Sequence, residues 1–185
     1  MRYLTALVTL ALLLFGAALA QGYYPHSDGL SWTYDNGVTQ ILSGPREFAG
    51  TDVMVMTQYL QGVPISETYL AYEPDGVFSY GTAAGGDTQV YQPALVLYEG
   101  LELTPGQSWQ SVSEIGDIEV VLSSQVIGTE GVQTPAGRYN TLQIRQVTDI
   151  GGSRTTTDLY FVPTVGVVRF VTEDGTVVDL IEKSF

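Results

Sequence analysis

The four-residue frame Gly-x-Ser-Trp occurs twice, and its two copies contain both tryptophans of the chain, Trp32 and Trp109. Two large aromatic residues in the same short frame, one in each half, are unexpected from chance β-type alternation alone. The repeated frame therefore suggests that one structural unit is present twice.

Further matches follow the two frames. Residues 41–43 (Ile-Leu-Ser) resemble residues 121–123 (Val-Leu-Ser), and Pro74 corresponds to Pro163. The gaps between matched segments fall at predicted turns, as expected for a duplicated β-unit. The predicted pseudo-repeats are residues about 29–82 and about 106–182.

The residue pattern between the turns is that of β-strands. Short runs rich in valine, threonine, tyrosine and isoleucine are separated by glycine-bearing turns, which is typical of strands with one buried and one solvated face. The best helical candidate, residues 93–99, is short and could equally be extended. We therefore predict an all-β fold with little or no helix after the leader. An antiparallel barrel, a half-barrel and a sandwich all fit this pattern.

Proline and glycine mark the turns, because proline fixes φ and glycine permits positive φ. The Asn-Gly pair at 36–37 is the strongest signal and predicts a type I′ hairpin. The predicted turn residues are Asn36, Gly37, Pro74, Gly76, Pro135, Gly137, Pro163 and Gly166.

The first 20 residues have the pattern of a secretory signal peptide. Arg2 precedes an apolar run at 4–15, and Ala-Leu-Ala at 18–20 is a typical cleavage site. The apolar run is shorter than the roughly 20 residues that a spanning helix needs, and no later run is long enough to span. We expect cleavage after Ala20, a single β-domain over 21–185, and a secreted or periplasmic protein.

Charge and cysteine content exclude several classes of function. Loss of the leader removes one of seven basic residues and leaves 20 acidic ones, so the net charge is about −14. Such a surface repels nucleic acid and anionic membranes. The chain has no cysteine, which excludes disulfides, thiol catalysis and thiolate metal ligands.

Residues that could carry chemistry are sparse. The single histidine, His26, stands between Pro25 and Ser27 in the lead-in; a Ser-His-Asp triad needs side chains that converge from separate elements, so we expect His26 to be solvent-exposed. One histidine without cysteine excludes standard zinc and copper sites within one chain. Asp117 and Glu119 share a strand face, but their spacing shows no cleft for glycoside hydrolysis. We predict no catalytic residue, no cofactor and no metal site.

Trp32 and Trp109 are the candidate ligand contacts. Stacking on a ligand is the more specific hypothesis for these side chains. Packing in the core or at its rim is the commoner use of large aromatics.

Three stretches of the second half form a recognisable pattern. They read Gly-x-Ser-Trp at 106–109, Val-x-Thr-Pro-Ala-Gly-x-Tyr-x-x-Leu-x-Ile at 132–144, and Leu-Tyr-Phe-Val-Pro-x-Val-Gly-Val-Val at 159–168. With Tyr-Tyr-Pro and Gly-x-x-Trp-x-Tyr over 23–34, the pattern resembles a broad group of uncharacterised secreted bacterial β-proteins, often classed as domains of unknown function. In outline these are similar to the half-barrels that carry lipoproteins or lipids across the periplasm. The resemblance implies export and an antiparallel β-fold, and it implies no catalytic residue.

Three functional hypotheses follow. The first is a secreted or periplasmic, non-enzymatic envelope protein that binds an apolar ligand, such as a lipid, or an envelope protein on a concave β-face. The second is a structural or assembly component whose exposed β-edges pair with partner chains. The third is a carboxylate-based hydrolase. The sequence leaves open the ligand, the partner, the pathway, the oligomeric state and any binding of cations by the acidic surface.

Overall fold

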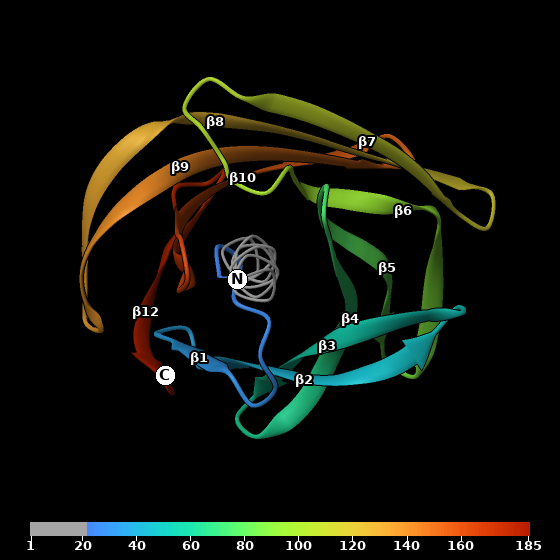
Figure 1. The fold of residues 1–185 in the computed structure, drawn as a ribbon, viewed down its shortest axis with the longest axis horizontal. Coiled ribbons are helices and arrows are strands. Elements are labelled where there is room, and N and C mark those ends of the chain that lie inside the picture. Colours follow the sequence, from blue (N-terminus) through green and yellow to red (C-terminus); the bar gives the residue numbers. More distant parts are fainter. Residues whose placement is uncertain (1–21) are drawn as a thin grey trace, which may run out of the picture.

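Twelve antiparallel strands form a closed barrel (Figure 1). The computed structural model describes residues 22–185, and no helix occurs among them. The predicted all-β fold is confirmed, and the barrel is the architecture observed among the three that the pattern allowed. The strands are β1 (Ser31–Tyr34), β2 (Val38–Phe48), β3 (Thr51–Leu60), β4 (Val63–Glu73), β5 (Gly76–Ala84), β6 (Asp87–Glu99), β7 (Ser108–Ile115), β8 (Ile118–Thr134), β9 (Gly137–Ile150), β10 (Ser153–Val162), β11 (Gly166–Thr172) and β12 (Val177–Lys183).

The predicted signal peptide, residues 1–20, lies outside the described residues. Residues 93–99, the best helical candidate, belong to β6 and are extended. No helix of residues 22–185 has the length and apolar character needed to cross a membrane.

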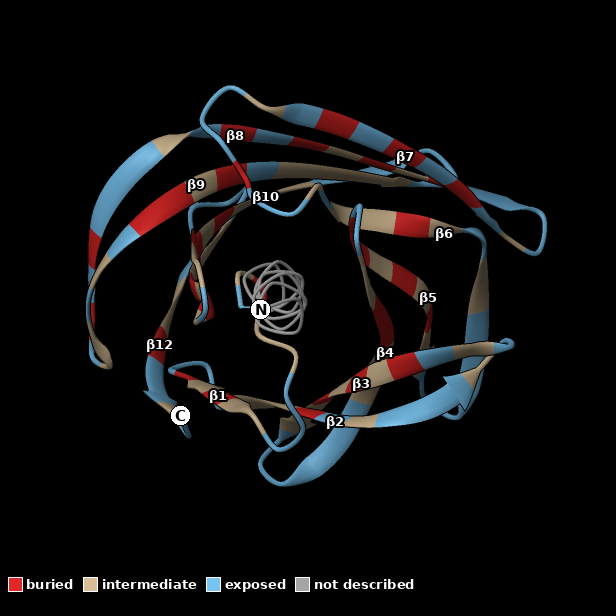
Figure 2. Cartoon of the chain, viewed as in Figure 1, coloured by how far each residue is buried: buried red, intermediate tan, exposed pale blue. Residues whose placement is uncertain are grey.

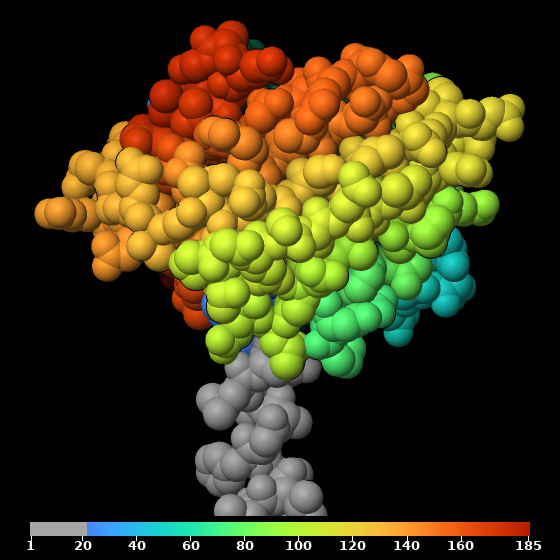
Figure 3. All heavy atoms as spheres, turned by 90° about the horizontal axis from the view of Figure 1, so that it is seen from above, coloured from blue at the N-terminus to red at the C-terminus, as the bar shows by residue number. Residues whose placement is uncertain are grey.

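Each strand pairs with the next one in the chain, and the first strand pairs with the last. In that closing pair Trp32 lies opposite Lys183 and Tyr34 lies opposite Leu180. In the space-filling view of Figure 3 the middle strands follow one another obliquely across the barrel wall in chain order. Closure satisfies the backbone groups that an open sheet edge would leave unpaired.

The junction between β6 and β7 is held differently from the others. A single ladder pair, Gln92 with Glu114, joins the two strands. Pro93 has no N–H to donate to the ladder. Instead, the Ser113 hydroxyl donates to the Pro93 carbonyl (2.6 Å), and the Ser111 hydroxyl accepts a backbone N–H of β6 (3.0 Å). Side-chain hydroxyls therefore take over part of the role of the ladder here.

Buried and exposed residues alternate along the strands, most regularly in β7 (Figure 2). Strand β3 differs because both of its faces are covered. Val53 and Val55 pack with Tyr69, whose ring stacks on Phe48 at 3.8 Å. On the opposite face of β3, Met56 lines the inside of the barrel.

The Asn-Gly turn lies where predicted, between β1 and β2, but the predicted type I′ geometry is wrong. In the loop from Asp35 to Gly37 only Gly37 has a positive φ, of 83°, whereas a type I′ turn needs positive φ at both central residues. The Gly37 N–H donates to the Tyr34 carbonyl at 3.0 Å. The result is a three-residue loop that ends in a left-handed glycine.

Pro74 and Pro163 lie in the turns β4–β5 and β10–β11. Gly76 follows the first turn with φ of 147°, and a Cβ there would lie 2.1 Å from the carbonyl oxygen of Tyr98. Only glycine fits at that distance. Gly166 follows the second turn with φ of 96°.

Pro135 and Gly137 shape the tip of the long β8–β9 hairpin, which folds back onto β12. The N–H of Ala136 at this tip donates to the Leu180 carbonyl at 3.2 Å. Val132 is buried close to the tip. The hairpin is therefore part of the packed structure and not a free loop.

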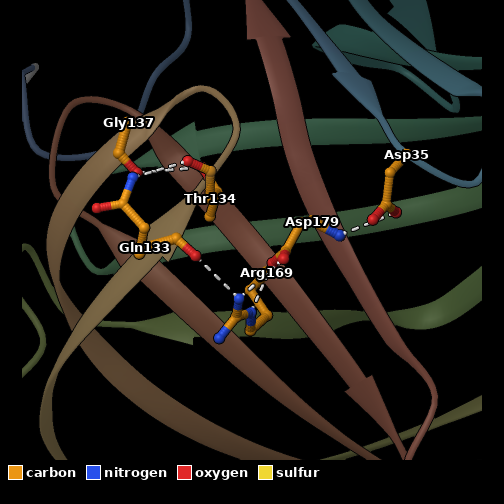
Figure 4. A network of polar contacts seen from close by, with 6 residues as sticks. All are labelled: Asp35, Gln133, Thr134, Gly137, Arg169 and Asp179. Atoms are coloured by element: carbon orange, nitrogen blue, oxygen red, sulfur yellow. Dashed lines mark hydrogen bonds and ion pairs between the residues drawn. The ribbon is translucent and has the colours of Figure 1, made fainter.

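An ion pair fixes the tip from the side (Figure 4). Arg169 contacts Asp179 through two hydrogen bonds, of 2.5 and 2.8 Å, and it donates to the carbonyl of Gln133 at 3.1 Å. The N–H of Asp179 in turn donates to the carboxylate of Asp35 at 3.1 Å. This network links β11 and β12 to the hairpin tip and to the first turn.

The two tryptophan frames occupy corresponding places in the strand order. Trp32 is the second residue of β1, and Trp109 is the second residue of β7. The backbone of Leu42 forms hydrogen bonds with the two residues before Ser31, and the backbone of Val126 does so with the two residues before Ser108. Val126, not Leu122, is therefore the structural counterpart of Leu42.

The sequence match of 41–43 with 121–123 is wrong in register. Strand β7 has eight residues and β1 has four, so β8 begins further along the chain from Trp109 than β2 does from Trp32. The predicted first repeat ends at 82, before the hairpin turn between β5 and β6, and so omits β6 (Asp87–Glu99). The duplication itself stays a prediction.

Candidate functional site

The inside of the barrel contains a cavity of about 380 Å³, within the range of about 300–1,000 Å³ that is usual for small-molecule sites. Its walls come from β1 to β6, from β9 to β11 and from the N-terminal segment. Side chains that are far apart in the sequence therefore meet here.

One end of the cavity is closed by aromatic rings. The rings of Tyr24 and Tyr98 stack with centroids 5.4 Å apart and an interplanar angle of 15°. Phe161 lies 5.8 Å from Tyr24 and 5.4 Å from Tyr98, and it is 1% exposed. Such packed rings give a firm apolar floor.

The N-terminal segment, residues 22–26, supplies part of this floor, and Figure 1 shows it (blue) inside the outline of the barrel. The carbonyl of Tyr23 accepts the N–H of Thr164 at 2.8 Å. The Tyr23 hydroxyl contacts the backbone of Leu103, and the Tyr24 hydroxyl donates to the Gly100 carbonyl at 3.1 Å. The segment is thus bound to the β6–β7 and β10–β11 connections.

His26 is half-buried in this segment, so its expected exposure to solvent is wrong. Its Nδ1 lies 2.9 Å from the Tyr24 carbonyl, and its ring lies 5.5 Å from that of Tyr72. Asp28 accepts the N–H of Gly44. The segment packs against the barrel, and the Asp28 carboxylate contacts β2.

The opposite end of the cavity is polar. Gln40 on β2, Gln58 on β3 and Gln146 on β9 line it. Gln40 and Gln58 are register partners on neighbouring strands, whereas β9 belongs to another part of the wall. All three lie near the strand ends remote from the N-terminal segment. None of their side chains has a hydrogen-bond partner among residues 22–185.

The lining contains no charged side chain. Burial raises the pKa of Tyr98 to about 12 and also raises the pKa values of Tyr34 and Tyr72. These phenols therefore remain neutral over the whole physiological range. The cavity is uncharged although the chain carries 20 acidic residues.

The two candidate tryptophans have different surroundings. Trp32 is 2% exposed and lines the cavity, and its indole N–H donates to the Val165 carbonyl at 2.6 Å. Trp109 packs in the core with residues that include Val126 and Leu142. The Trp109 indole N–H has no partner within residues 22–185. A ligand contact by either side chain stays a prediction.

The two carboxylates singled out in the sequence lie away from the cavity. Asp117 is in the β7–β8 turn and Glu119 is on β8; both are exposed, and neither lines the cavity. Residues 22–185 contain no group of three or more histidine and carboxylate side chains placed to hold a metal ion.

Comparison with known proteins gives two structural likenesses. No protein-family model matches the chain, and no curated protein matches it in sequence. A chain from Bacteroides fragilis, described as a candidate exported protein with a YmcC-like fold, is 11% identical and superposes with a TM-score of 0.49 over 88% of this chain and 99% of its own. A candidate lipoprotein from Parabacteroides distasonis is 11% identical, with a TM-score of 0.43 over 88% of this chain and 98% of its own.

Proposed function

We propose that this protein is an exported, non-enzymatic binding protein that holds an apolar small molecule inside its barrel. The signal-peptide pattern of residues 1–20 supports export to the periplasm or the exterior. The observation that carries the binding role is the uncharged cavity of about 380 Å³ with its aromatic floor.

The chemistry of the walls favours binding over catalysis. An apolar ligand gains free energy by leaving water for an apolar surface, and the packed rings of Tyr24, Tyr98 and Phe161 offer such a surface. A carboxylate-based hydrolase would need two acids that face each other across a cleft. The lining of this cavity has no carboxylate.

The alternative of an assembly component rested on exposed β-edges. Among residues 22–185 every strand has a neighbour on both sides, and only the β6–β7 seam is held by a single ladder pair, supplemented by two serine hydroxyls. Binding inside the barrel is therefore the better-supported function.

The test uses the uncharged fluorescent probe N-phenyl-1-naphthylamine and the mature chain. We expect probe emission to rise on binding and Trp32 emission to fall. The variant Thr68→Trp places a large ring in the cavity and should abolish binding, whereas Thr88→Trp, on an exposed position of β6, should bind normally. Equal binding by both variants would place the probe outside the barrel and refute the proposal.

Export is tested separately, by expressing the full chain in a bacterial host and sequencing the N-terminus of the accumulated protein. A mature chain that starts at Gln21 in the periplasm or medium is the expected result. Retention of residues 1–20 in the cytoplasm would contradict it.

A further inference from the structure

We propose that the ligand is a neutral amphiphile, with an apolar chain or ring on the aromatic floor and an uncharged head group at the glutamines. The head group would both donate and accept hydrogen bonds, as an alcohol or a primary amide does. This inference rests on the proposed function and specifies the chemical class of ligand for the same cavity.

The first argument concerns the glutamines. A glutamine side chain offers two N–H donors and a carbonyl acceptor. Gln40 and Gln58 stand side by side on β2 and β3, and Gln146 comes from β9. None of the three side chains has a partner within residues 22–185, although all three are half-buried. Half-buried amides without partners are suited to a head group that can satisfy both kinds of hydrogen bond.

The second argument concerns three hydroxyl groups. Tyr72 on β4 and Tyr98 on β6 line the cavity, and neither hydroxyl has a hydrogen-bond partner within residues 22–185. In contrast, Tyr24 and Tyr34 bond to backbone carbonyls. With Thr68 on β4, whose hydroxyl also has no partner within residues 22–185, the cavity thus holds six neutral polar side chains that are free to meet a ligand. A wholly apolar molecule would leave all of them unpaired.

The third argument excludes charged head groups. Burial of an ion is unfavourable unless an opposite charge is close, and no lysine, arginine or histidine lines the cavity. Arg46, Arg145 and Arg169 already form ion pairs with carboxylates of the chain. An anionic head would also be repelled by the overall charge. A cationic head would find no carboxylate in the lining.

The experiment compares three eight-carbon ligands that differ only in the head: octanamide, 1-octanol and octanoate. Each is titrated against bound N-phenyl-1-naphthylamine at pH 8, where octanoate is ionised, and thermal shifts are measured in parallel without the probe. We expect octanamide and octanol to compete at concentrations at least about tenfold lower than octanoate. Octanoate should compete better as the pH is lowered towards 4 and its carboxylate becomes protonated.

Two variants locate the head group. Gln58→Leu should bind the probe normally but lose about fivefold or more in affinity for octanamide. Gln125→Leu is the matched control, because Gln125 is an exposed residue of β8, and it should leave all affinities unchanged.

The outcomes separate the two proposals. Equal competition by octanoate and octanamide, or an unchanged octanamide affinity in Gln58→Leu, would overturn the head-group assignment while leaving the cavity as a binding site. Absence of both probe binding and thermal shifts with every ligand would overturn the proposed function itself, and the head-group assignment with it.

Discussion

Removal of the Tyr24 ring tests whether the N-terminal segment forms the floor of the cavity. Tyr24 is 7% exposed, stacks on Tyr98, contacts Phe161 and donates its hydroxyl to Gly100. Two substitutions separate these contributions. Tyr24→Phe removes only the hydrogen bond, and Tyr24→Ala removes the ring as well.

The expected costs differ severalfold. Loss of the hydroxyl should cost about 0.5–1.5 kcal/mol, the usual net value of one hydrogen bond. Truncation of a buried aromatic to alanine costs about 3–5 kcal/mol. For a chain of this size about 1 kcal/mol corresponds to 2–4 °C in Tm.

The measurements are thermal unfolding and probe binding for both variants. Tyr24→Phe should lower Tm by about 1–6 °C and bind the probe normally. Tyr24→Ala should lower Tm by at least about 6 °C and weaken probe binding, because the floor is open. Tyr59→Ala is the control, since Tyr59 is half-buried and outside the core clusters. The reasoning is refuted if Tyr24→Ala melts within about 2 °C of the wild type and binds the probe equally well.

Three further predictions concern single side chains. The Ser124 hydroxyl is buried without a partner, so Ser124→Ala should leave the free energy of unfolding unchanged or raise it by up to about 1 kcal/mol, as measured by urea unfolding. A fall in the free energy of unfolding by more than that amount would indicate an unseen partner. The hydrogen bond from Arg145 lowers the pKa of Asp158, so this pair contributes stability above the usual aspartate pKa of about 3.9 that is lost as the pH falls through the lowered value. Arg145→Met should therefore weaken the dependence of Tm on pH below 4, and an unchanged dependence in that range would contradict the pairing. Burial raises the pKa of Tyr98 to about 12. The contribution of the neutral phenol to the stability of the fold is therefore complete below about pH 10 and is lost as the pH rises through 12. Tyr98→Phe should weaken the dependence of Tm on pH in this alkaline range, and an unchanged dependence would argue against a buried phenol.

Local sequence patterns predicted the strand content because alternation and turn residues act over a few neighbouring positions. The turn at Asn36 and Gly37 was located correctly for this reason. Its geometry depends on how β1 and β2 pair, which the dipeptide does not determine. The closure of the barrel likewise depends on the pairing of β1 with β12, and no local pattern reports such a contact.

The cavity was harder to predict. Tyr23 and Tyr24 resemble an ordinary lead-in, because their partners Gly100, Leu103 and Thr164 lie far away in the sequence. Glutamine in an alternating strand is normally interpreted as part of a solvated face. In β3 that interpretation fails, since both faces are covered and the side that bears Gln58 encloses the cavity.

The pairing of the first strand with the last has a consequence for biogenesis. Ser31 and Ser184 exchange hydrogen bonds at this junction, so the barrel closes only when both ends of the chain are in the same compartment. A chain translocated with its N-terminal end first would present β1 long before β12 emerges. Contacts of such long sequence separation form slowly, and the apolar lining would meanwhile be exposed to aggregation. Efficient export would therefore depend on holding the emerging chain unfolded until its last strand has crossed.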